Sequence, residues 1–108
     1  MTTFESRNPS RFTSVVTTVE LADAPTFVAA CRNAHDAQPE WASIPAPARG
    51  RVIAQVGRLV EANKDALSRL VTEEIGKVFA EALGEVQEVV DTCDFFLGEG
   101  RRLYGQTV

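Results

Sequence analysis

Apolar residues recur at helical spacing along most of this chain of 108 residues. The longest stretch of this kind covers residues 78–97, where apolar side chains return every three or four positions, as on one face of an α-helix. Shorter stretches with the same period cover residues 49–62, 64–75 and 23–38. The pattern predicts a mainly α-helical chain with about four helices.

Capping and breaking residues separate these stretches. Asp23 is a suitable N-cap for the first helix, and Pro39 is expected to break it after Gln38. Asn63 can end the second helix and begin the third, which Gly76 then terminates. A glycine inside the last helix, Gly84, costs about 1 kcal/mol relative to alanine, so we expect another element to approach closely there.

The first 22 residues form an N-terminal arm that precedes the helical section of residues 23–108. Residues 12–19 are rich in Thr and Val, which favours one short strand. A lone strand leaves backbone donors and acceptors unpaired, and the polar start of the chain offers no obvious partner strand. This interpretation indicates a chain that is a piece of something larger, within the size of a single domain.

Charge and composition exclude several classes of protein. The net charge is −4 and the basic residues are scattered, so nucleic acid is not an expected partner. No apolar run approaches the roughly 20 residues that span a bilayer, and the polar start does not resemble a signal peptide. We therefore expect a cytoplasmic protein without a membrane partner.

Two cysteines and one histidine are the first candidates for catalysis or metal binding. Cys31 and Cys93 lie far apart, without metal-ligand spacing, and both fall on apolar helix faces. Core packing is the expected role of both thiols, and His35 is expected at the surface because it has no partner at a telling spacing. Trp41 is expected to pack between helices. These residues predict no metal site.

Several motifs of the helical section resemble the aldehyde dehydrogenase superfamily. They are Trp41, Arg49, Glu74-Ile75-Gly76-Lys77, Glu81-Ala82 and Glu85-Val86. Residues 44–50 and 84–94 are similar to one branch of it, the antiquitin branch or α-aminoadipic semialdehyde dehydrogenases. The resemblance covers residues 8–108 and corresponds to the first part only of a family polypeptide. Apart from the resemblance, Gly76-Lys77 is expected to end one helix before the next begins. A phosphate-binding role is not expected, since no glycine-rich phosphate loop surrounds it.

The resemblance implies that these helices are a piece of an α/β NAD-binding domain. It implies the N-terminal portion of an NAD-dependent oxidoreductase of lysine metabolism, which oxidises α-aminoadipic semialdehyde to α-aminoadipate. In that family the cofactor sheet, the general base and the nucleophilic cysteine come later in the polypeptide. We therefore expect no catalytic residue, cofactor-binding residue or bound cofactor in this chain, which is expected to be inactive alone.

One residue, Glu88, is a candidate for substrate selection. It shares the face of the last helix opposite the apolar stripe with Glu81, Glu85, Thr92 and Phe95. From the residues alone, the favoured interpretation of this face is a solvated acidic surface. The resemblance implies that the matching glutamate meets the amino-acid end of the aldehyde, where a carboxylate can pair with an ammonium group.

A second interpretation is non-enzymatic. Helices that normally cover a sheet expose apolar area when the sheet is missing, and such patches favour association with another protein. The chain would then be an interaction module, or a gene remnant, that self-associates or binds a full-length aldehyde dehydrogenase subunit.

Overall fold

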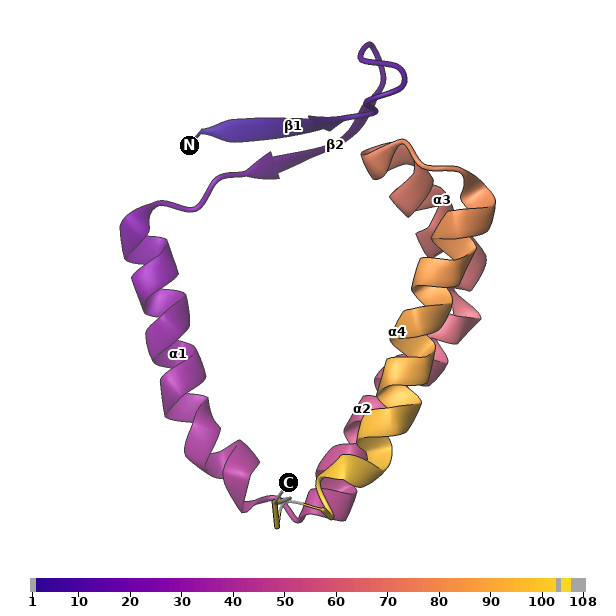
Figure 1. Ribbon diagram of the computed structural model, residues 1–108. Coiled ribbons are helices and arrows are strands. Elements are labelled where there is room, and N and C mark those ends of the chain that lie inside the picture. The colour runs from indigo at the N-terminus through magenta and orange to yellow at the C-terminus, as the bar shows by residue number, and fades with distance from the viewer. Residues whose placement is uncertain (1, 103, 106–108) are drawn as a thin grey trace.

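The computed structural model describes residues 2–102 and 104–105. Its elements in chain order are β1 (Thr3–Arg7), β2 (Val15–Glu20), α1 (Ala24–Ser43), α2 (Ala46–Ala62), α3 (Lys64–Ile75) and α4 (Phe79–Glu99). Helices α2, α3 and α4 gather on one side, α1 runs apart from them, and the strands connect the two sides at one end (Figure 1). The prediction of a mainly helical chain with four helices is confirmed.

The strands form an antiparallel hairpin. Thr3 lies opposite Glu20 and Arg7 opposite Val15, with an irregularity between Ser6 and Arg7. The prediction of a single strand without a partner was therefore wrong, because the polar start of the chain supplies the partner. Water reaches both faces of this ribbon, so β1 needs no apolar alternation and carries no strand signal. The unpaired strand no longer argues for a missing part.

The loop of the hairpin rests on the junction between α3 and α4. Gly76 caps α3 with a positive φ of 78°, as its position after the apolar stretch predicted. A Cβ at Gly76 would lie 2.8 Å from Cγ of Pro9, so a larger residue would push the loop away as well as strain the backbone. One glycine therefore serves the helix end and the docking of the hairpin.

Helix α1 begins as predicted and ends later than predicted. Asp23 caps it, since its Oδ1 accepts hydrogen bonds from the Thr26 backbone N–H at 2.8 Å and from the Thr26 hydroxyl at 2.6 Å. Pro39 was expected to break the helix and instead lies inside it. Proline removes one backbone hydrogen bond, to the carbonyl of His35, and water can replace that bond because His35 is exposed.

The Asp23 cap makes the start of α1 sensitive to acid. The hydrogen bonds from the Thr26 hydroxyl and N–H hold the pKa of Asp23 below its ordinary value of 3.8. A carboxyl whose pKa is lowered by folding stabilises the folded state above its unfolded pKa, and this contribution disappears as the pH falls through the folded pKa. We expect circular dichroism at 222 nm to show a loss of helix below pH 3.8, and Asp23→Asn to remove this acid-dependent part. An unchanged titration in the variant would contradict the assignment.

The packed part of the molecule is the contact of α4 with α2 and α3. The buried residues of α4 recur at helical spacing along one face: Ala82, Val86, Val90 and Cys93. The buried residues of α2 are small, namely Gly50, Ala54 and Gly57. A Cβ at Gly50 would lie 2.2 Å from the carbonyl oxygen of Leu97, so the two helix backbones approach very closely.

This close approach corrects two expectations. The apolar period of residues 49–62 predicted that the large side chains of α2 would share one packing face, namely Val52, Ile53, Val56, Leu59 and Val60. Ile53 and Val60 are only half-buried, and Val52, Val56 and Leu59 are 48%, 45% and 55% exposed. Small side chains, which give a weak hydropathy signal, make the contact with α4 instead. Gly84 was expected to allow a close approach, but nothing would lie within 4 Å of a Cβ there, because it faces away from the packed helices.

Helix α3 is joined to α4 through a buried polar contact. Ser68 and Ala82 are both fully buried. The Ser68 hydroxyl donates to the carbonyl of Lys64 at 2.7 Å, within its own helix, and lies 3.5 Å from the carbonyl of Ala82 on α4. The Lys64 ammonium also donates to Oε1 of Gln87 at 2.6 Å, so α3 is held to α4 at two points.

The chain exposes more surface than a compact protein of its size. Its accessible surface is 8400 Å², whereas a monomer of 11.8 kDa is expected to expose about 5,900 Å². Its Cα radius of gyration is 18.3 Å, against about 13 Å for a compact domain of 100 residues. Helix α1 contributes most clearly to this large accessible surface, since none of its residues is buried.

Candidate functional site

The acidic face of α4 is the first candidate site, and it is exposed as the sequence predicted. Its residues are Glu81, Glu85, Glu88, Thr92 and Phe95. Lys77, just before the helix, pairs with Glu85 across two turns. The hydrogen bond that the Lys77 ammonium donates to Glu85 raises the pKa of Lys77, and the charges of Glu85, Glu81 and Glu88 raise it further. Glu85 is thus neutralised locally, whereas the described residues place no cation in an ion pair with Glu88.

Two adjoining hollows meet at Glu88. One has a volume of about 360 Å³ and is lined by Glu88, Asp91, Thr92, Phe95 and Phe96. The other, of about 280 Å³, is lined by Glu85, Glu88, Val89, Thr92 and Cys93. The rings of Phe95 and Phe96 meet edge to face with centroids 5.3 Å apart. A carboxylate beside aromatic faces suits a ligand with a cationic head, because both groups attract positive charge.

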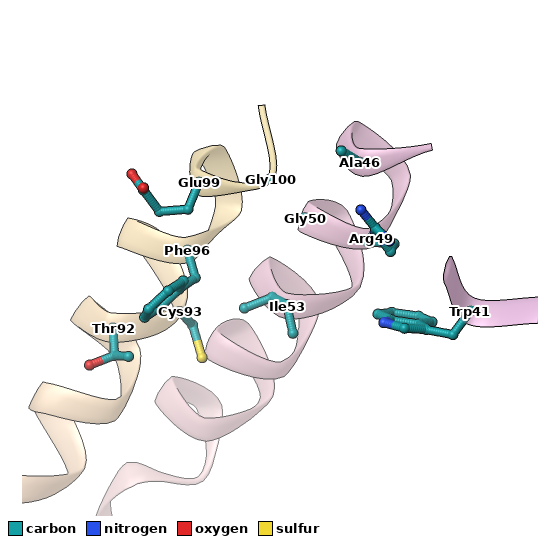
Figure 2. Close-up of a pocket in the computed structure, with 10 residues that line it drawn as sticks. All are labelled: Trp41, Ala46, Arg49, Gly50, Ile53, Thr92, Cys93, Phe96, Glu99 and Gly100. Carbon is teal, nitrogen blue, oxygen red and sulfur yellow. The ribbon is translucent and has the colours of Figure 1, made fainter. Parts of the chain in front are cut away.

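A third cavity, the α1–α2–α4 cavity, lies where the end of α1 meets the start of α2 and the end of α4. Its volume is about 410 Å³. The lining residues are Trp41, Ala46, Arg49, Gly50, Ile53, Thr92, Cys93, Phe96, Glu99 and Gly100. Figure 2 shows Ile53 on the side of α2 that faces α4, Phe96 on α4, and Trp41 reaching from the end of α1 toward α2. Trp41 was expected to pack between helices; it lines this cavity from the end of α1 and remains 42% exposed.

The two charged side chains that line this cavity differ in their partners. The Arg49 guanidinium makes a long hydrogen bond of 3.4 Å to the carbonyl of Ala42. Glu99 is paired with Arg102, and its side chain points away from α2 in Figure 2. The sequence had marked Arg49 only as a motif residue, and Trp41 as a motif residue and a residue that packs between helices. The cavity itself could not be anticipated, because three distant segments form it.

The structure separates the two cysteines. Cys93 is buried between α4 and α2, as expected, while Cys31 is exposed on α1, so its predicted role in the core was wrong. The apolar face of α1 has no partner among the described residues. His35 is exposed, as expected. Within residues 2–102 and 104–105, no group of three or more His, Cys, Asp or Glu side chains could hold a metal ion.

Comparison with known proteins identifies the class of this polypeptide. The aldehyde dehydrogenase family matches residues 1–108. The chain belongs to that family, and the mostly helical structure with its two-stranded sheet is consistent with a piece of the aldehyde dehydrogenase fold.

Three of its relatives lie in one branch of the family. It is 39% identical over 106 residues to aldehyde dehydrogenase family 7 member A1 of Pisum sativum, covering 98% of this chain and 21% of the relative. It is 38% identical over 103 residues to family 7 member B4 of Arabidopsis thaliana, covering 94% and 20%. It is 44% identical over 68 residues to the alpha-aminoadipic semialdehyde dehydrogenase of Rattus norvegicus, covering 63% and 13%. The chain thus spans about a fifth of the pea and Arabidopsis relatives, and the resemblance to the antiquitin branch is confirmed.

No helix among the described residues combines the length and the apolar character needed to cross a membrane.

Proposed function

We propose that this chain is the N-terminal section of an NAD-dependent aldehyde dehydrogenase that oxidises α-aminoadipic semialdehyde to α-aminoadipate, a cytoplasmic reaction of lysine metabolism. The observation that carries the proposal is the similarity to the family 7 relatives over nearly the whole chain. The rat relative, whose name states this substrate, supports the choice of aldehyde. The exposed carboxylate of Glu88 suits the ammonium group of that substrate.

The chain alone is proposed to be inactive. Dinucleotide sites form at the carboxyl ends of parallel strands, beside the start of the following helix. The described residues contain one sheet, an antiparallel hairpin, so they do not fit NAD. Cys93 is buried between α4 and α2 and Cys31 is exposed on α1, and no hydrogen bond among the described residues activates either thiol. We therefore expect the cofactor-binding and catalytic residues in the rest of a family polypeptide.

The role proposed for Glu88 is to select the substrate. Its carboxylate lines both hollows of the acidic face and, unlike Glu85, has no ion-pair partner among the described residues. An ammonium group placed in either hollow would gain a charge-assisted hydrogen bond, and in the larger hollow it would also gain the nearby rings of Phe95 and Phe96. A plain aldehyde such as hexanal gains neither contact. The carboxylate thus favours amino-acid aldehydes without taking part in their oxidation.

We expect Glu88→Gln to impair oxidation of α-aminoadipic semialdehyde selectively. The test uses a chimera in which this chain replaces the matching section of the pea relative. We expect kcat/KM for the semialdehyde to fall about 10- to 100-fold, the usual worth of a hydrogen bond to a charged group, while hexanal changes less than about twofold. Glu81→Gln is the matched control, since Glu81 lies on the same face outside both hollows. Equal losses on the two aldehydes would rule out the selective role.

The surface of α1 favours a second function, that of a module that associates with a copy of itself or with a full-length aldehyde dehydrogenase subunit. Phe27, Val28 and Trp41 on α1 are 68%, 44% and 42% exposed. Exposed apolar patches of this kind favour association, and the large accessible surface of the chain adds to the argument. Sedimentation velocity tests this second function. An associating module should sediment faster as its own concentration rises, or when the pea relative is added.

A further inference from the structure

The α1–α2–α4 cavity has the form of a small-molecule site. Trp41, Ile53 and Phe96 give it apolar walls, and its volume of about 410 Å³ lies within the range of roughly 300–1,000 Å³ that is usual for ligand pockets. Trp41 and Phe96 are 42% and 52% exposed, so their rings are accessible to a ligand. Flat aromatic faces of this kind favour an aryl or alkyl group.

One side of the cavity carries uncompensated positive charge. Arg49 is half-buried, and no carboxylate among residues 2–102 and 104–105 forms an ion pair with it. Among the described residues that line the cavity, the only acidic one is Glu99, which is paired with Arg102 and points away from α2 (Figure 2). Helix α2 also begins at this side without a side-chain cap and without an acidic residue in its first turn. A guanidinium in these surroundings favours a carboxylate, which it can bind through two parallel hydrogen bonds.

We propose that this cavity binds a monocarboxylate with an aryl or alkyl tail. The carboxylate lies against Arg49, and the tail fills the space between Trp41, Ile53 and Phe96. The inference goes beyond the proposed enzyme and does not depend on it, because Glu88 does not line this cavity. Failure of the substrate-selection test would therefore leave this proposal standing, and the reverse also holds.

The test is a titration of the 108-residue chain, followed by the fluorescence of Trp41, which is the one tryptophan of the sequence. Three probes share one tail and differ in the head group: 4-phenylbutyrate, 4-phenylbutan-1-ol and 4-phenylbutylamine. We expect saturable binding of phenylbutyrate with a Kd of about 1 mM or below, and at least about tenfold weaker binding of the alcohol and the amine. Acetate at the same concentrations should cause no change, since it lacks the tail.

Variants separate the contribution of the charge from that of the walls. Arg49→Met should bring phenylbutyrate and the alcohol to equal affinity, whereas Arg51→Met, an exposed arginine on the same helix, should change neither. Phe96→Ala should weaken all three probes alike, and Phe95→Ala, whose ring lies outside the cavity, should not. Both phenylalanines are more than half exposed, so neither substitution removes a core residue. Equal affinity for the three probes in the unaltered chain, or no saturation with phenylbutyrate, would overturn the proposal.

Discussion

Replacing Gly50 by alanine is expected to destabilise the chain by about 3 kcal/mol or more, although alanine is the better helix former. The added Cβ would lie 2.2 Å from the carbonyl oxygen of Leu97 and 3.2 Å from its carbonyl carbon. These are backbone atoms of α4, so no side-chain rotation can relieve the clash and the two helices must separate. Their separation also weakens the burial of Ala54 and Val90. Urea denaturation followed by circular dichroism measures the loss.

Gly84→Ala is the matched control for this substitution. It makes the same chemical change inside α4, where nothing lies within 4 Å of the added Cβ. We expect it to stabilise the chain by about 0.5–1 kcal/mol, because alanine loses less backbone freedom on folding. If both variants shifted the urea midpoint in the same direction, the close contact between α2 and α4 would be wrong.

The second large effect is expected at Val90. This side chain is 6% exposed in the α2–α4 contact, so Val90→Asp would place a carboxylate in an apolar environment. We expect a loss of more than about 3 kcal/mol at pH 7, since an unpaired buried charge has no compensating partner. Burial raises the pKa of this carboxyl group in the folded state, so the deficit should shrink as the pH falls from 7 toward about 4 and stay constant below it, where the group is neutral in the folded and the unfolded state.

The adjacent Val89→Asp has the same cost in helix propensity without the burial, because Val89 is 46% exposed. We expect its effect to stay within about 0.5 kcal/mol. Thermal unfolding of the two variants at about pH 7 and about pH 4 completes the comparison. A Val89 variant as unstable as the Val90 variant would mean that α4 does not bury the face that carries Val90.

The sequence predicted helices far better than it predicted their contacts. Apolar periodicity located four helices, and Asp23 and Gly76 were correctly identified as helix boundaries because capping is a local property. The strand β1 was missed because a ribbon with water on both faces has no apolar alternation. Pro39 was misjudged because the loss of one hydrogen bond can be tolerated on a solvated helix.

Some features of the candidate site could likewise be predicted from the sequence, and others depend on tertiary contacts. The exposure of Glu88 and the burial of Cys93 follow from their positions on α4, whose buried face matches the apolar stripe of the sequence. The exposure of Cys31 could not be predicted, since it depends on whether another element covers α1. The cavity beside Arg49 likewise depends on three segments that are far apart in the sequence.

What the sequence determined by itself is therefore the number of helices, most of their boundaries and membership of the aldehyde dehydrogenase family, all of which depend on local periodicity, capping or motifs. Only the tertiary structure decided that Gly50, Ala54 and Gly57 form the contact of α2, while Val52, Val56 and Leu59 are left exposed. The physical reason is that hydropathy reports how much a side chain gains from burial. How closely two backbones can approach depends on the absence of side-chain atoms, which a hydropathy pattern does not record.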